Sequence, residues 1–275
     1  MKRLPLLLLI LSLTGCAAPE APPPAVEVMA PAPVEERFYL GLAVTASLSQ
    51  SMHATEAFPG YARTEMTAAA VVVDGGGVIR ACTVDGISAR VPFDTAGTLL
   101  LFDGTVFPSK RTLGDAYGMH KASQLGAEWY RQADAVAAHC VGKTADELRP
   151  ADAVTSVTIS TDELLQTVRR AAQQATLPAA APDAPVLVCR AVMTGSRSAH
   201  ADTGQTGLAG LRGVFLACAD GAEAGCALSS AVPFTAAGRI DCDISLGLSP
   251  LSDALTLTDL TDHECQLLRQ AAGKS

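Results

Sequence analysis

The sequence predicts an α+β fold built from two tandem copies of one unit, in which helices pack on an antiparallel sheet and the second copy is shortened. Short motifs recur along the chain, and a Pro/Ala-rich stretch at 178–185 separates the two occurrences. In each half, strand-like segments precede amphipathic helices, which is typical of the α+β class. The recurring motifs are Ser51–Ala54 with Ser198–Ala201, Val91–Gly97 with Val232–Gly238, and Thr161–Arg169 with Thr261–Arg269.

The first copy begins with a predicted β-hairpin. Residues 68–73 and 78–84 are rich in small and β-branched apolar residues, and a Gly-rich turn lies between them. The β-branched run Val154–Ile159 predicts a further strand. A helix is expected next, with Ser160 and Glu163 as its capping box. Its expected apolar face is Leu164, Leu165, Val168, Ala171 and Ala172.

An insert distinguishes the first copy from the second. The offset between matching motifs falls across the segment from about Asp103 to Leu148, so this segment has no counterpart later in the chain. Its apolar residues recur at helical spacing and predict a helix over His120–Cys140, ended by Gly142. The predicted stripe is Leu125, Trp129, Ala133, Val136 and Cys140.

The second copy repeats the hairpin and the closing helix without the insert. Its hairpin is expected to turn at Asp220 and Gly221. Thr261 and Glu264 predict a capping box, and Gly273 predicts the end of the helix. The predicted apolar side of this helix is Cys265, Leu268 and Ala272.

The first sixteen residues have the pattern of a lipoprotein signal peptide. Lys2 and Arg3 precede the apolar run Leu4–Leu13, which is too short to span a bilayer. The run ends in Thr14, Gly15 and Cys16, and this ending resembles the bacterial lipobox. The resemblance implies acyl chains such as palmitate on Cys16, which anchor the protein in the cell envelope, facing out of the cytoplasm and on the outer membrane if the organism is Gram-negative.

Four segments are expected after the signal peptide: a tether, the first copy, a linker and the second copy. Residues 17–36 are rich in Pro, Ala and Glu and form an extended tether. Residues 37–177 are the first copy, 178–185 a linker, and 186–275 the shortened, Cys-rich second copy.

Composition excludes two classes of function. Hydrophobic residues make up 49% of the 275 residues and charged residues 17%, so the chain can bury a core and is not intrinsically disordered. The net charge is −8 with no basic stripe, so a nucleic-acid partner is excluded. No apolar run reaches the roughly 18 residues of a membrane-spanning helix. The expected contacts are the membrane, through Cys16, and another envelope protein, whereas the oligomeric state is left open.

The first copy resembles the FMN-binding domain family, which includes flavin-carrying subunits of sodium-pumping quinone reductases and many lipoproteins. The family has a hairpin with a turn of the type G-x-I, matched by Gly77–Ile79. An aromatic residue then precedes a G-K-x-x-x-[DE] phrase, matched by Trp129 and Gly142–Glu147. A closing motif leads into a helix, matched by Asp152–Ser160, and the resemblance covers most of 66–175.

The resemblance implies a flavin site at Thr158, with Thr155 and Ser156 in the same motif and Trp129 as a stacking partner. Family members with covalent FMN have Gly-Ala where this chain has Ser156 and Val157. These bulkier side chains restrict the backbone, so we expect no covalent flavin on most molecules. Non-covalent flavin, another flat ligand and a fold retained without flavin stay open, and no cofactor is assigned.

The sequence is therefore consistent with two functions. The first is flavin-linked electron transfer outside the cytoplasm, as the resemblance implies. The alternative is a non-catalytic binding or structural lipoprotein of the envelope. No catalytic residue is predicted, because the sequence has no G-x-S-x-G elbow, P-loop or Rossmann glycine pattern.

The cysteines and histidines of the chain are candidates for disulfide bridges and metal ligands. Export implies an oxidising compartment, so disulfides are expected in the second copy, with Cys218 and Cys226 as the predicted pair across the hairpin turn. His53 and His200 follow matching serines, and a shared metal site is the weaker alternative. No pair with metal-ligand spacing accompanies them, so no metal site is predicted.

We expect Cys16→Ser to abolish membrane anchoring, because the thiol that carries the acyl chains is removed. Detergent phase partitioning of the protein made in a bacterial host measures this, with wild type in the detergent phase and the variant in the aqueous phase. A variant that partitions like wild type contradicts the lipobox interpretation.

Overall fold

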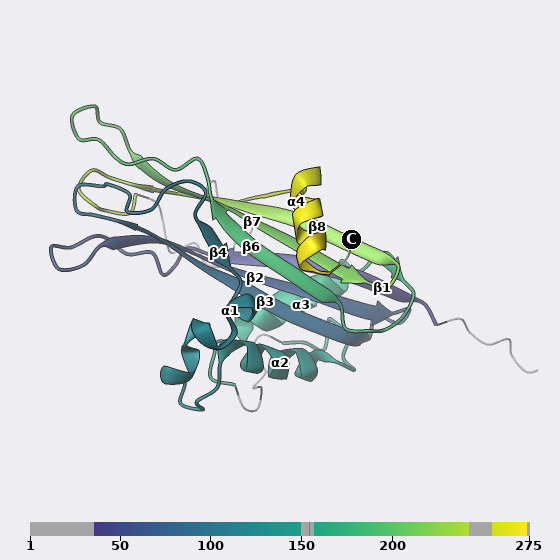
Figure 1. The fold of residues 1–275 in the computed structure, drawn as a ribbon. Coiled ribbons are helices and arrows are strands. Elements are labelled where there is room, and N and C mark those ends of the chain that lie inside the picture. Colours follow the sequence, from purple (N-terminus) through teal and green to yellow (C-terminus); the bar gives the residue numbers. More distant parts are fainter. Residues whose placement is uncertain (1–35, 150–153, 155–156, 242–254, 274–275) are drawn as a thin grey trace, which may run out of the picture. The chain divides into compact units, whose positions relative to one another are not determined.

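Two antiparallel sheets lie face to face in the computed structural model, which describes residues 36–149, 154, 157–241 and 255–273 (Figure 1). The first sheet has the strand order β3-β2-β1-β5 and the second β4-β6-β7-β8-β9. The strands of the first sheet are β1 (Phe38–Ser47), β2 (Gly60–Asp74), β3 (Ile79–Phe93) and β5 (Leu177–Ala179). Those of the second are β4 (Val106–Pro108), β6 (Val186–Met193), β7 (Gly207–Ala219), β8 (Ala222–Phe234) and β9 (Leu255–Thr258). Cys16, Thr155 and Ser156 lie outside the described residues.

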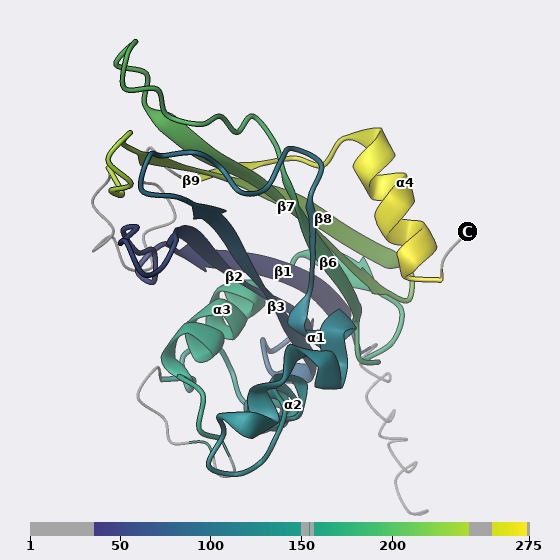
Figure 2. The ribbon, with the colours of Figure 1, turned by 60° about the vertical axis from the view of Figure 1, so that its left-hand side comes forward.

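Helices cover the outer faces of both sheets (Figures 1 and 2). On the first sheet these are α2 (Trp129–Cys140) and α3 (Asp162–Gln173), and the short α1 (Lys110–Leu113) packs beside β3. Single 3-10 turns, η1 (Gly114–Tyr117) and η2 (Met119–Lys121), connect α1 to α2. The second sheet carries α4 (Asp262–Ala271). Within the described residues, no helix is both long enough and apolar enough to cross a membrane.

The predicted fold class is confirmed, because hairpin β2–β3 with α3 recurs as hairpin β7–β8 with α4. The two hairpins pair in the same register, with Gly60 opposite Phe93 and Gly207 opposite Phe234. A Cβ on Gly60 would lie 2.4 Å from the Phe93 ring, and one on Gly207 2.3 Å from the Phe234 ring. Both copies therefore need glycine where their own phenylalanine folds across the strand.

The inner faces of the two sheets bury one shared core. Where β3 and β8 end, the rings of Phe93 and Phe234 stack in this core, with centroids 4.3 Å apart and an interplanar angle of 5°. The strands also cross between the copies, because β4 of the insert pairs with β6. In the other direction, β5 pairs with β1 and uses Pro178 and Ala179 of the expected linker.

The insert and the segment before α3 differ from the predictions. The predicted helix His120–Cys140 is only α2, because Gly126 takes a φ of +60° and Leu125 is exposed. The rest of the predicted stripe, from Trp129 to Cys140, is buried. The described residues of Val154–Ile159 form no strand. Ser160 does not cap α3, whose N-cap is Thr161 without a side-chain bond.

The second-copy predictions hold for the closing helix but not for the Cys218–Cys226 pairing. Thr261 and Glu264 form the predicted capping box. Cys218 pairs across the hairpin with Glu223, and Cys226 pairs with Phe215. The two cysteines are therefore three positions out of register and point to opposite faces of the sheet, which is incompatible with a bridge. The predicted Cys218–Cys226 pair is wrong.

The histidine motif also has a different register from the predicted one. His53 Nδ1 accepts the N–H of Ile240 at 2.9 Å, and Ser198 Oγ accepts the N–H of Leu99 at 3.0 Å. Leu99 and Ile240 are matching positions of the two copies, two residues after the end of the Val91–Gly97 and Val232–Gly238 motifs. Ser198, and not His200, is therefore the counterpart of His53. Among the described residues, no group of three or more His, Cys, Asp or Glu side chains is arranged to hold a metal ion.

Truncating either ring of the central stack should destabilise the whole unit. We expect Phe93→Ala and Phe234→Ala each to lower the free energy of unfolding by about 3–5 kcal/mol. Phe102 is 77% exposed. The control Phe102→Ala should therefore change it by less than about 0.5 kcal/mol. Urea denaturation measures all three variants, and a core variant as stable as the control would contradict the shared core.

Candidate functional site

A cavity of about 350 Å³ lies on the helix-covered side of the first sheet. Strand β2, helix α1, the segment between α1 and α2, the first residue of α2 and the start of α3 contribute its lining. The lining residues are Gln50, Arg63, Glu65, Thr67, Lys110, Tyr117, Met119, Ala122, Ser123, Trp129, Thr158, Ile159, Ser160, Glu163 and Leu164. We call this cavity the Trp129 pocket.

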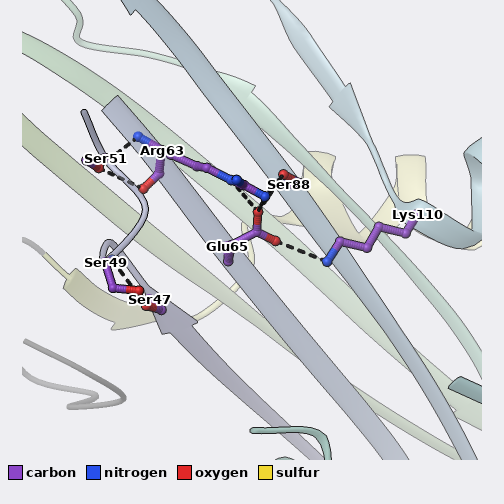
Figure 3. Close-up of polar contacts among 7 residues, drawn as sticks. All are labelled: Ser47, Ser49, Ser51, Arg63, Glu65, Ser88 and Lys110. Carbon is purple, nitrogen blue, oxygen red and sulfur yellow. Dashed lines mark hydrogen bonds and ion pairs between the residues drawn. The ribbon is translucent and has the colours of Figure 1, made fainter. Parts of the chain in front are cut away.

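A nearly buried carboxylate, Glu65, organises one wall of the pocket (Figure 3). Its Oε1 accepts hydrogen bonds from Arg63 Nε and Ser88 Oγ, both at 2.6 Å. Its Oε2 lies 3.0 Å from Lys110 Nζ. Burial alone would raise the pKa of Glu65, but Lys110, Ser88 and Arg63 hold it below its usual value. Glu65 is therefore ionised and saturated with partners.

Contacts at the N-terminus of α1 fix the position of Lys110, the first residue of this helix. The Ser109 side chain accepts the N–H of Thr112 at 3.0 Å and caps this helix. The buried Asp85 on β3 accepts the N–H of Arg111 at 3.1 Å. With the helix held in this way, the Lys110 ammonium lies 4.9 Å from the centroid of the Trp129 ring.

Two aromatic rings face this ammonium. Tyr117 is the second, with its centroid 5.6 Å from Lys110 Nζ. Both distances lie within the range of cation–π attraction, which is stronger where water is excluded. The pocket thus combines aromatic surface with an internal ion pair, a combination suited to a flat ligand that carries a polar group.

A second carboxylate in the pocket, Glu163 of α3, is not saturated. Its Oε1 is buried and has no hydrogen-bond partner among the described residues. Burial raises the pKa of Glu163, the negative charge of Glu65 adds to this, and Thr67, Lys110 and Thr45 oppose it. A carboxyl group with a raised pKa can exchange a proton closer to neutral pH.

Thr158 and Trp129, two of the residues implicated by the sequence, both line the pocket. Thr158 is exposed, and its N–H and hydroxyl both donate to Gln132 Oε1, at 2.7 and 3.1 Å. Gln132 is buried in α2 and also accepts the N–H of Ile159 at 3.2 Å. One amide of α2 therefore holds the segment before α3 against the pocket.

A second anchor holds the segment that carries Tyr117 and Met119. The Glu128 carboxylate accepts the N–H groups of Met119 and His120, at 2.9 and 3.2 Å, and contacts the His120 ring. This segment folds back on the start of α2 for that reason.

The corresponding place in the second copy holds an ion pair. Arg212 lies on β7 opposite Ser229, just as Glu65 lies on β2 opposite Ser88. Its guanidinium bonds Glu264 of α4 at 2.5 and 2.9 Å and donates to Thr258 Oγ1 at 3.0 Å. Hydrogen bonding from Arg212 lowers the pKa of Glu264 to about 2. The strand residue is thus arginine in the second copy where the first copy has glutamate, and its charge is neutralised by Glu264 of α4.

Sequence reasoning missed Glu65, Lys110 and Glu163 as pocket residues. One signal was present, because Arg63, Glu65 and Thr67 are polar residues at alternate positions of β2, although Thr64 between them interrupts the alternation. Glu163 was interpreted as a helix cap instead. Lys110 has no local signal, since its role depends on tertiary contacts.

No protein-family model, curated protein or solved structure matches the chain. The resemblance to the FMN-binding domain family stays a hypothesis.

Glutamine substitutions at Glu163 and Glu65 should change the free energy of unfolding at neutral pH in opposite directions. A raised folded-state pKa contributes stability below the unfolded-state pKa of about 4.3 and loses it as pH rises. Glu163→Gln should therefore increase the free energy of unfolding at neutral pH, and the gain should vanish in acid.

Glu65→Gln is the matched control. Its lowered pKa contributes stability above the unfolded-state value, which is lost as pH falls. The substitution breaks a nearly buried ion pair and should cost about 3 kcal/mol at neutral pH and less in acid. Urea titrations at several pH values measure both variants, and effects of the same sign would contradict the assigned ionisation.

Proposed function

We propose that this chain is a lipid-anchored protein of the cell envelope that binds a small ligand with a flat ring in the Trp129 pocket. The signal-peptide pattern and Cys16 support the location. The pocket supports the binding, because its volume of about 350 Å³ is within the range of small-molecule sites.

One observation carries the proposal. Trp129 and Thr158 come from different elements, far apart in the sequence, yet both line one pocket. Contacts from Gln132 and Glu128 hold the two segments that flank Trp129. Trp129 itself is buried and the Lys110 ammonium lies over its ring, so a conjugated ring would have to displace this ammonium to stack on the tryptophan.

Flavin mononucleotide is the first ligand to test. With Lys110 moved off the Trp129 ring, this ring would stack on the isoalloxazine system, and Arg63 and Lys110 are cations of the kind that bind a phosphate once released from Glu65. Thr158 is exposed at the pocket and suits a polar contact with the ligand. When bound, FMN would supply electron-transfer chemistry, whereas the chain would bind and orient it.

A non-catalytic binding role is the second candidate, and the charge distribution favours it. Arg63 and Lys110 are already paired with Glu65, so neither is free for a phosphate. Glu163, when ionised, would repel one. Under this alternative the ligand is uncharged or cationic, and the protein acts by holding it or by contacting an envelope partner.

The fluorescence of Trp129 is a direct test, because it is the single tryptophan of the chain. Titration with FMN or riboflavin should quench it saturably if a flavin stacks on the ring. A response to riboflavin and not to FMN would favour an uncharged ligand. If neither FMN nor riboflavin changes the fluorescence saturably, flavin is excluded as the ligand and the non-catalytic binding role remains.

Charge variants sharpen the result. Glu163→Gln removes a repulsive carboxylate and should tighten FMN binding by roughly tenfold, with little effect on riboflavin. Glu56→Gln removes an exposed carboxylate that does not line the pocket and should change neither affinity. Equal effects of the two substitutions would contradict binding in the Trp129 pocket.

A further inference from the structure

Two cysteines meet where α2 ends against the first sheet. Cys140 is the last residue of α2 and is fully buried. Cys82 lies on β3, is partly buried and packs against the same apolar cluster that contains Cys140. On β3, Cys82 is paired with Val71, whose side chain belongs to that helix-facing cluster.

Backbone bonds fix the two elements to each other at this point. The Gly142 N–H donates to the Ile79 carbonyl, and the Ile79 N–H donates to the Lys143 carbonyl, both at 2.8 Å. A bridge between Val78 and Thr144 extends this contact. The chain that leaves α2 therefore runs along the start of β3 and brings Cys140 to Cys82.

The two thiols interact directly. Hydrogen bonding to Cys140 and burial raise the pKa of the Cys82 thiol, and the nearby Arg111 guanidinium opposes this. At neutral pH the Cys82 thiol is then mainly protonated, so its thiol–disulfide exchange is slow and becomes faster in alkali.

We propose that Cys82 and Cys140 form a disulfide that ties the end of α2 to β3. The proposal uses the oxidising location proposed above, where bridges persist. It differs from the sequence-based expectation, which placed the bridges in the second copy.

The chemistry needs a disulfide donor, either a protein thiol oxidase of the envelope or oxidised glutathione. The Cys82 thiolate, on the more accessible residue, attacks one donor sulfur, forms a mixed disulfide and releases one donor thiol. The Cys140 thiolate then attacks Cys82 Sγ and releases the second donor thiol. The two cysteines lose two electrons and two protons, and the donor gains both.

The bridge would also stiffen the ligand site. Helix α2 begins with Trp129 and carries Gln132, which holds Thr158 and Ile159. A covalent tie at the other end of this short helix restricts its motion on β3. Reduction should therefore loosen the wall of the Trp129 pocket.

The full-length protein, purified without reductant and equilibrated with oxidised glutathione, tests the proposal directly. Trypsin releases Cys82 in residues 81–90 and Cys140 in residues 132–143, each with no other cysteine. After alkylation under denaturing conditions, mass spectrometry should find these two peptides joined. Finding both cysteines alkylated, or each joined to glutathione or to another cysteine, would overturn the proposal.

Thermal unfolding gives a second readout. Reduction should lower the Tm of wild type by about 5–15 °C, and Cys82→Ala and Cys140→Ala should abolish this response. Cys226→Ser, a control on the second sheet, should keep it. Retention of the reductant response in both alanine variants would contradict the bridge. None of these measurements uses a ligand, so failure of the ligand proposal would leave them unaffected.

Discussion

The stacked pair of Phe93 and Phe234 is the interaction on which the rest of the structure depends. Each ring closes the end of its own hairpin, and the two rings meet where the sheets face each other. Because each ring crosses a glycine on the neighbouring strand, the register of both hairpins is fixed at the same point. The two copies are therefore halves of one core, and neither sheet can bury its inner face without the other.

The insert makes the two copies functionally unequal. In the first copy it supplies α1 and α2, which carry Lys110 and Trp129 to the outer face of the sheet. In the described part of the second copy, α4 is the only helix there, and Arg212 and Glu264 neutralise each other beside Thr258. The pocket with an aromatic wall thus lies in the copy that contains the insert. At the equivalent position, the shortened copy has an ion pair.

The two carboxylates of the Trp129 pocket differ in how well their charge is balanced. Glu65 is fully matched by Arg63 and Lys110, so this wall presents little net charge to a ligand. Glu163 is the unmatched group, and burial keeps its carboxyl closer to neutrality than an exposed glutamate. A ligand that donates a hydrogen bond to Glu163 could bind without breaking the Glu65 ion pairs, whereas one that stacks on Trp129 must first displace Lys110.

Local patterns in the sequence determined the two hairpins, the helix with the Thr261–Glu264 capping box and the fold class, because turn chemistry, capping and apolar periodicity act over a few residues. The sequence-based predictions were wrong at three places: Gly126 shortened the predicted insert helix, Val154–Ile159 formed no strand in its described residues, and hairpin register separated Cys218 from Cys226. The pocket depends instead on contacts between distant segments. Trp129 and Thr158 could be named from the sequence, but only tertiary packing brought Glu65, Lys110 and Glu163 beside them, since side chains from β2, α1 and α3 meet there through contacts that no local sequence window contains.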